Sequence, residues 1–464
     1  MASTAATAEP QPTLERRLSP FDAAAIIVSN VIGGGILFTP PQVAAAVPNA
    51  VLFLAAWGAG GLLAFAGAMA YAELAALRPR AGGEYVYLRH AYGPLAGFLT
   101  GWTSFVAGFS GAMAASAVVL VIYLDRFIPG IASDTPLFVV PLPYVPLVVS
   151  RHALAAIAAV WLMARIHIQG VGPGRVVGNV LAALKVTALL IFIGLGLTIG
   201  AGSAANLQQS TGAVGATAWL LALIPVMFTY SGWNAAAYMA EEIRDPGRNV
   251  PLALAVGTAA VIVIYLLLNG LYLYVMPVGE LARVQGSVLD VIADRLLGGR
   301  AGDIMGVVSI VSLSAGLSAW TFAGPRVYYA MARDGVFFPA AARVHRRYKT
   351  PAVSIVAQAA WTTVLILSGG ADALTRFTGF AITLFAGVAV AAVFVLRARE
   401  PEAPRPFKAF GYPWTPGIFV VVSAVMVVNA IYNDPGPSGA GALIIVAGVP
   451  LYYYFRGTLK QTGG

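Results

Sequence analysis

Short polar segments divide this chain into long apolar runs, and that division constrains its fold more than any other feature of the sequence. A bilayer core about 30 Å thick is crossed by a helix of roughly 20 apolar residues. We therefore predict twelve transmembrane helices, one in each run of suitable length. The predicted spans are residues 21–46, 51–77, 94–124, 150–168, 176–199, 216–240, 251–275, 303–332, 351–368, 374–396, 416–431 and 441–454.

The composition excludes a water-soluble particle. Hydrophobic residues make up 59% of the chain and charged residues only 10%, whereas soluble proteins carry about 25% charged residues. Too few charges are present to cover the surface of a soluble protein of this size. The sequence therefore predicts an all-α polytopic membrane protein, and the segments between the spans are too short for a soluble catalytic domain.

Lysine and arginine residues are concentrated on one side of the predicted membrane. If the N-terminus is cytoplasmic, 20 of the 28 basic residues lie in cytoplasmic segments and five in outer segments. This asymmetry follows the positive-inside rule. It predicts a multi-pass protein of the plasma (cell inner) membrane with both termini cytoplasmic. The net charge of +9 then reflects topology, and we expect no nucleic-acid partner.

The sequence offers no residues for covalent or metal chemistry. It contains no cysteine, which excludes disulfides, thiolate metal sites and cysteine nucleophiles. The four histidines, His90, His152, His167 and His345, fall in loops or at span ends without metal-ligand spacing. We therefore expect no metal, no cofactor and no catalytic residue, and we expect that the chain is not an enzyme.

Two predicted spans contain residues that weaken a helix. Residues 33–35, in the first span, are three consecutive glycines, which have low helix propensity and no side chain to hinder backbone approach. In the sixth span, Pro225 and residues 228–234 place helix-weakening and polar groups in mid-span. Close packing through small residues is the alternative reading of the glycines alone. Unwound backbone in a bilayer must be buried in protein or line a cavity.

The two weak points occupy matching places in two sets of five spans. Paired interruptions of this kind indicate an inverted-repeat transporter with its substrate site near the membrane midplane. Free N–H groups at the start of a half-helix suit a carboxylate, whereas free carbonyls suit an ammonium group. A site with both suits a zwitterion, which favours an α-amino acid over a sugar or a simple ion.

An ordered set of motifs resembles the amino acid/polyamine/organocation superfamily, and most closely its L-type amino acid transporter group. The matching stretches cover the first three spans, the sixth and the eighth. They are residues 32–36 with Thr39 and Pro40, residues 71–74, 82–85 and 92–94, residues 230–234 with Glu241 and Glu242, residues 246–249, and Arg326 with residues 333–335.

The resemblance implies a fold of two inverted five-helix repeats, the LeuT-like fold, plus two C-terminal helices. The N-terminal arm would comprise residues 1–20 and the first repeat, helices 1–5, residues 21–199. The second repeat, helices 6–10, would comprise residues 200–396. Residues 397–464 would form the last two helices and a short cytoplasmic C-terminus.

The resemblance also implies the substrate contacts. Backbone N–H groups around the glycines would hold the carboxylate, carbonyls of both breaks would face the amino group, and Phe228 would lie over the substrate as an aromatic gate. Asn234 matches a position near the pocket, although a packing role is equally open. The implied substrate-binding residues are Val31, Ile32, Gly33, Gly34, Gly35, Phe228, Thr229, Ser231 and Asn234.

Lys185 lies deep within the fifth predicted span, where an ionisable residue is a functional candidate. Its long side chain could instead reach the inner headgroups. The resemblance implies a tethered cation where sodium sits in sodium-coupled relatives, and hence sodium-independent transport. The sequence leaves open whether Lys185 exchanges protons and couples transport to them.

Charges near the inner span ends have two readings. Glu73, Glu241 and Glu242 lie near Arg78, Arg244 and Arg248 in the sequence and could form inner-gate salt bridges or solvated helix ends. Arg326 is expected to anchor the inner end of the eighth span. Because the break motifs bring no acidic side chain to the pocket, neutral amino acids are favoured as substrates.

Three other functions stay open. A cationic amino acid or polyamine carrier would need an acidic residue in the pocket. A non-transporting membrane receptor or sensor for amino acids is the alternative from another class, and a membrane-embedded enzyme is the weakest. L-type light chains pair by disulfide with a glycoprotein; without cysteine, this chain is expected to be a monomer or a noncovalent oligomer.

Overall fold

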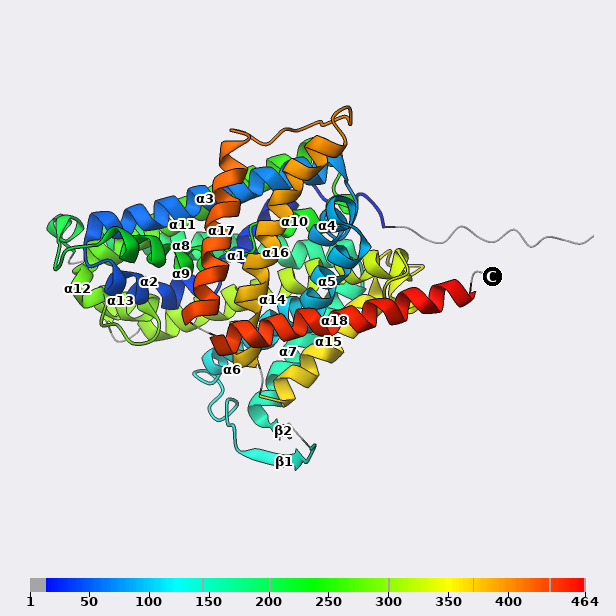
Figure 1. Ribbon diagram of the computed structural model, residues 1–464. Helices are drawn as coiled ribbons and strands as arrows, with labels where there is room; N and C mark the ends of the chain where they lie inside the picture. The colour runs from blue at the N-terminus through cyan, green and yellow to red at the C-terminus, as the bar shows by residue number, and fades with distance from the viewer. Residues whose placement is uncertain are drawn as a thin grey trace, which may run out of the picture.

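The computed structural model describes residues 14–143, 146–199, 202–298, 301–369, 371–433 and 435–462. Residues 1–13 of the predicted N-terminal arm lie outside this set. The fold is a bundle of helices with one small hairpin (Figure 1).

Most helices coincide with the predicted spans. They are α1 (Pro20–Val31), α2 (Gly35–Ala46), α3 (Ala50–Leu77), α5 (Pro94–Thr103), α6 (Phe109–Leu124), α7 (Arg151–Ile168), α8 (Val171–Thr198), α9 (Ala216–Thr229), α10 (Ala235–Tyr238), α11 (Pro246–Val275), α14 (Ala301–Arg333), α15 (Ala352–Leu367), α16 (Ala371–Arg399), α17 (Trp414–Asn433) and α18 (Pro435–Thr462). The remaining elements are α4 (Glu84–Tyr92), α12 (Val278–Leu281), α13 (Val288–Leu297), β1 (Pro136–Val140) and β2 (Leu147–Ser150). A π-helical turn, Ser104–Gly108, joins α5 to α6, and short 3₁₀ turns cover Ala204–Gln208, Ala240–Glu242 and Pro339–Ala342.

The polytopic membrane fold is confirmed. Nine helices in the described part of the chain are long and apolar enough to cross a membrane, and α1 with α2 makes a tenth candidate. The predicted spans at residues 216–240 and 351–368 contain the shorter apolar helices α9 and α15. Every predicted span thus contains helix, while the count of twelve crossings and the inverted repeat stay predictions.

Both predicted helix breaks are present. A capping box starts α1, because Ser19 accepts a hydrogen bond from the Asp22 N–H and the Asp22 carboxylate accepts one from the Ser19 N–H. The helix ends at Val31, and α2 continues at an angle of 52°. In the sixth span, α9 ends at Thr229 and residues 230–234 form turns before the short α10. The structure therefore resolves the glycine alternative in favour of unwound backbone.

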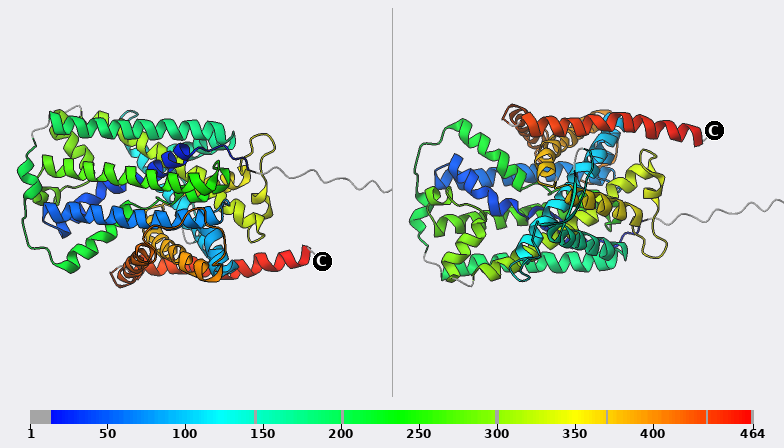
Figure 2. Two further views of the ribbon diagram at one scale, coloured as in Figure 1. Left: turned by 90° about the horizontal axis from the view of Figure 1, so that it is seen from above. Right: turned by 90° about the horizontal axis from the view of Figure 1, so that it is seen from below.

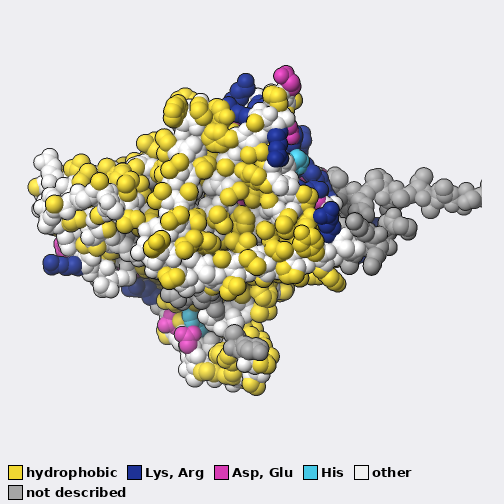
Figure 3. Space-filling model, in the orientation of Figure 1, with side chains coloured by type: hydrophobic (Ala, Val, Ile, Leu, Met, Phe, Trp, Pro, Cys, Tyr) yellow, Lys and Arg dark blue, Asp and Glu magenta, His cyan; other side chains and the backbone are white. Residues whose placement is uncertain are grey.

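The two ends of the bundle differ in charge. In Figures 1 and 2, α3, α8 and α11 run along its length, and the C-terminal end of α18 lies at the same end as the start of the described chain. The face shown in Figure 3 is mostly apolar, and its lysine and arginine side chains gather mainly at that end. We call this the arginine-rich end.

The two longest segments between predicted spans contain structure that the apolar pattern did not predict. They are residues 125–149 and 276–302, which are long enough to form covers or gates over the bundle. The first contains an antiparallel hairpin of β1 and β2, which projects sideways from the bundle (Figure 1). The second contains α13, whose Val288, Leu289 and Ile292 are buried, so this segment covers part of the bundle end.

Ion pairs join helices at the arginine-rich end, but their partners differ from the sequence neighbours considered above. Glu242 is fully buried and accepts hydrogen bonds from Arg326 at 2.7 and 3.0 Å. Glu241 pairs with Arg333 at 2.8 Å. The contacts of Glu73 are with Arg397, at 2.6 and 2.8 Å, and with Arg405 and the Ala409 N–H. Arg78 instead pairs with Glu400.

Arg326 therefore anchors α14 to the end of the sixth span. Its side chain is 1% exposed, donates to the Phe322 carbonyl at 2.7 Å and lies 3.9 Å from the Phe322 ring centre. Both ions are out of water, so each depends on the other for its stability.

Replacing one member of the buried Arg326–Glu242 pair tests how strongly each ion depends on the other. Arg326→Met should destabilise the protein by about 3–5 kcal/mol, because the Glu242 carboxylate is left buried without its partner. The double variant Arg326→Met, Glu242→Leu should recover most of that loss. Thermal unfolding of the three proteins in detergent measures both effects. A single variant as stable as the parent would contradict the account.

Candidate functional site

The two helix breaks face each other at the centre of the bundle. The Asn30 side-chain N–H donates to the Gly232 carbonyl at 3.1 Å, and the Tyr265 hydroxyl lies 2.9 Å from the Val31 carbonyl and 3.2 Å from the Thr229 carbonyl. Tyr265 is fully buried, so one side chain of α11 bridges both breaks.

Two glycines permit this close approach. Gly232 has φ of +102°, and a Cβ there would lie 2.7 Å from the Asn30 amide nitrogen. A Cβ at Gly35 would lie 3.0–3.2 Å from atoms of Thr229. Larger residues at either place would push the breaks apart.

Lys185 does not extend to the headgroups. It is fully buried in α8, and its ammonium donates to the Ile32 carbonyl at 2.5 Å and to the Ser29 carbonyl at 3.2 Å. Ser312 of α14 also donates to Ile32, at 3.4 Å. The ammonium thus meets the free carbonyl end of α1, where the helix dipole is negative.

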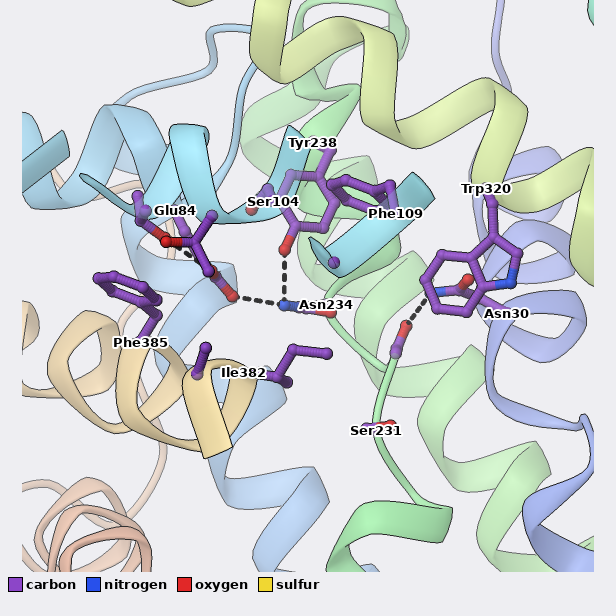
Figure 4. Close-up of a pocket in the computed structure, with 15 residues that line it drawn as sticks. Asn30, Glu84, Ser104, Phe109, Ser231, Asn234, Tyr238, Trp320, Ile382 and Phe385 are labelled. Atoms are coloured by element: carbon purple, nitrogen blue, oxygen red, sulfur yellow. Dashed lines mark hydrogen bonds between the residues drawn. The ribbon is translucent and has the colours of Figure 1, made fainter. Parts of the chain in front are cut away.

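A cavity lies beside the second break, with about 560 Å³ of atom-free space including its opening. Figure 4 shows Asn30, Ser231 and Asn234 of the breaks around it, together with side chains from α4, α6, α14 and α16. The lining residues are Asn30, Glu84, Thr100, Thr103, Ser104, Gly108, Phe109, Ser231, Gly232, Asn234, Tyr238, Trp320, Ala381, Ile382 and Phe385.

One side of the cavity is a buried hydrogen-bond network centred on Glu84. Its Oε1 accepts from the Tyr71 hydroxyl at 2.6 Å and from the Asn234 amide at 2.7 Å, and its Oε2 lies 3.5 Å from the Thr100 hydroxyl. Asn234 also donates to the Tyr238 hydroxyl at 3.0 Å (Figure 4). The break motifs themselves bring no acidic side chain to this cavity, but Glu84 reaches it from α4, outside both breaks.

The predicted site residues fall into two groups. Ser231 and Asn234 line this cavity. The other predicted residues surround the breaks, but none of them lines it. Phe228 is 44% exposed and lines a second cavity with Ser231 and Trp233, on the side of α17. Thr229 is buried and hydrogen-bonds Thr39 of α2 at 2.9 Å.

Sequence reasoning missed the lining residues that come from other elements. Glu84 had a signal, since it follows Gly82 and Gly83, which both adopt positive φ at the start of α4. Asn30 also had a signal in the sequence, because it is a polar residue close to the glycines of the first break. Trp320 and Phe385 had none, because apolar residues recur throughout both helices. The described residues contain no cluster of three or more potential metal ligands.

Comparison with known proteins agrees with this geometry. A family model described as amino acid permease matches residues 18–455. The cystine/glutamate transporter of Homo sapiens is 29% identical over 448 residues, which cover 95% of this chain and 85% of the relative. The human large neutral amino acids transporter small subunit 2 is 29% identical, covering 95% and 80%. The human b(0,+)-type amino acid transporter 1 is 30% identical, covering 96% and 89%.

These relatives are L-type transporters, in keeping with the motifs at the two breaks. Because the family model spans nearly the whole bundle, both breaks and the cavity lie within the matched region. The chain belongs to the amino acid permease family.

Proposed function

We propose that this permease is a sodium-independent secondary carrier that moves neutral L-amino acids by alternating access. The observation that carries the proposal is the meeting of two broken helices beside one cavity, with the Lys185 ammonium bound to the first break. A carrier needs a site that binds and releases its substrate unchanged, so no covalent step and no enzyme activity form part of the proposal.

The groups around the breaks suit a zwitterion. The first N–H groups of α2, around Gly33, Gly34 and Gly35, have no partner within the helix and carry the positive end of its dipole. They are the proposed carboxylate site. The Asn30 Oδ1 is buried without a hydrogen-bond partner in the described structure, while its amide N–H is held by Gly232. That oxygen is the proposed acceptor for the substrate ammonium.

The cavity lining favours an uncharged side chain. Phe109, Trp320, Ile382 and Phe385 give it an aromatic and aliphatic wall. Glu84 is the acidic exception, but neutral donors already bond both its oxygens. The runner-up is a cationic amino acid or polyamine carrier, which Glu84 favours because its hydrogen-bond partners in the described part of the chain, Tyr71, Thr100 and Asn234, are not basic.

Sodium independence rests on Lys185. Its ammonium holds the Ile32 and Ser29 carbonyls, which are oxygen ligands of the kind sodium would use. A fixed cation at that point removes both the need and the space for a mobile one. Whether the carrier exchanges amino acids or couples to protons is the choice that the transport assay decides.

The same proposal covers orientation and assembly. The arginine-rich end is proposed to face the cytoplasm of a plasma (cell inner) membrane, because basic residues favour that side. Both ends of the described chain lie there (Figure 2). With no cysteine for a disulfide-linked heavy subunit, the proposed state is a monomer or a noncovalent oligomer.

Uptake of labelled alanine into sodium-free proteoliposomes tests this function. Uptake only into vesicles preloaded with amino acid identifies an exchanger, and uptake into empty vesicles driven by an inward proton gradient identifies a symporter. Transport that requires sodium would refute the proposal. No transport of neutral, cationic or polyamine substrates would favour a membrane amino acid receptor instead.

Replacing Lys185 should disable the carrier. Lys185→Met should lower uptake by about a hundredfold, equivalent to about 3 kcal/mol, because the carbonyl end of α1 loses its buried cation. Lys408→Met is the control, since Lys408 is exposed. Uptake and Tm are measured on the same preparations. A Lys185→Met protein that transports like the parent would remove the basis for sodium independence.

Neutralising Glu84 should weaken substrate binding without reversing selectivity. Glu84→Gln should raise the KM for alanine about tenfold, because Asn234 loses a charged acceptor worth about 1.5 kcal/mol. The exposed Glu402→Gln is the control. Competition by ornithine is measured in parallel. If the parent prefers ornithine and Glu84→Gln loses that preference, the cationic alternative replaces the neutral one.

A further inference from the structure

A third, smaller cavity lies between α1, α7, α8 and α14, apart from the proposed substrate site. Its polar lining comprises Ser29, His167, Arg175 and Ser318, and two glycines of α8 complete one wall. It has room for about one water molecule.

Two polar atoms of this lining have no hydrogen-bond partner in the described structure. They are the Ser29 Oγ and the His167 Nδ1, on side chains that are only 2% and 3% exposed. The other nitrogen of His167 is engaged, since Nε2 lies 2.9 Å from the Ser318 hydroxyl. Leaving a buried polar atom unpaired costs about 1–3 kcal/mol, and such atoms are normally satisfied by protein or ordered water.

Small residues of α8 keep the space around the imidazole open. A Cβ at Gly174 would lie 2.5 Å from the His167 Nδ1, and a Cβ at Gly178 would lie 3.7 Å from the Ser318 hydroxyl. With Ala182, these glycines follow one helix face towards Lys185, at intervals of three and four residues.

We propose that this cavity binds an ordered water between Ser29 and His167, and that it is the route by which protons reach and leave Lys185. The Ser29 carbonyl accepts from the Lys185 ammonium at 3.2 Å, while its hydroxyl belongs to the cavity lining. At the other end, Arg175 is 38% exposed, so the cavity lies between Lys185 and the arginine-rich end.

The transfer conserves charge and atoms. The Lys185 ammonium gives one proton to water and becomes a neutral amine, and that proton leaves towards the arginine-rich end; uptake is the reverse. Two basic groups near His167, one from α14 and one from α8, are each paired with an acidic group. Arg326 of α14 binds Glu242, and Arg175 of α8 lies 3.6 Å from Asp22 of α1. This role rests on the proposed carrier function.

The direction in which Ser29→Ala changes Tm tests whether the cavity holds a water molecule. If water bridges the Ser29 Oγ and the His167 Nδ1, Ser29→Ala removes one of the hydrogen bonds that hold this water and weakens the one to His167. This should lower Tm by about 2 °C. If the cavity is dry, the same change removes an unpaired hydroxyl and should raise Tm. A higher Tm would therefore overturn the water site.

Transport assays distinguish the proposed proton route from the carrier function. His167→Gln and Gly174→Ala should lower proton-driven alanine uptake into empty vesicles about tenfold, while exchange between equal internal and external alanine changes less than about twofold. Gly172→Ala is the matched control on α8, since nothing lies within 4 Å of a Cβ there. His167→Gln and Ser29→Ala carry the test if Gly174→Ala does not fold.

Two results would overturn the route and leave the carrier intact. One is proton-driven uptake in His167→Gln equal to that of the parent. The other is a parent that exchanges alanine but shows no proton-driven uptake. A parent that neither exchanges nor accumulates any amino acid would instead contradict the proposed function itself.

Discussion

The contact between the Lys185 ammonium and the carbonyl end of α1 is the interaction on which the centre of this structure depends. Within a bilayer, backbone groups released by a broken helix must be satisfied by protein. The carbonyls of Ser29 and Ile32 find a buried cation, which also complements the negative end of the helix dipole. Because α1 can stop there, α2 starts beside the sixth span with its N–H groups free.

The second break is held by side chains. Asn30 binds Gly232, and Asn234 binds the Glu84 carboxylate. This links the proposed substrate site to α4, whose other end carries Arg89, a partner of Asp334 at the arginine-rich end. Under the proposed alternating access, opening that end must separate paired charges, so the ion pairs set part of the cost of exposing the site at the arginine-rich end.

Local features of the sequence predicted much of this architecture. Apolar run length marks the spans, and consecutive glycines or Pro225 with polar neighbours mark the breaks, because each effect acts within a few residues. The depth of Lys185 was readable for the same reason. Its partners were not predictable, because a lysine at that depth has several possible acceptors, and the resemblance implied only a cation where sodium sits in sodium-coupled relatives.

Contacts between distant segments were not predictable from one sequence. Glu242 lies two residues from Arg244 but binds Arg326, 84 positions away. Glu84 reaches Asn234 across 150 positions, from a short helix that the span pattern did not include. The β1–β2 hairpin was missed because its apolar, proline-rich segment has no alternation of polar and apolar residues. In each case the contact depends on how distant segments pack in three dimensions, and the sequence does not distinguish the actual partner from other possible ones.

Substrate protection of one cavity position shows whether an amino acid binds at the paired breaks. Because the sequence contains no cysteine, Ser231→Cys places a single thiol in the cavity lining, where its rate of alkylation can be followed in sodium-free membranes. We predict that a transported neutral amino acid slows alkylation about tenfold at saturating concentration, and that sodium alone does not. Alkylation at the same rate with and without every amino acid tested would contradict a substrate site at the paired breaks.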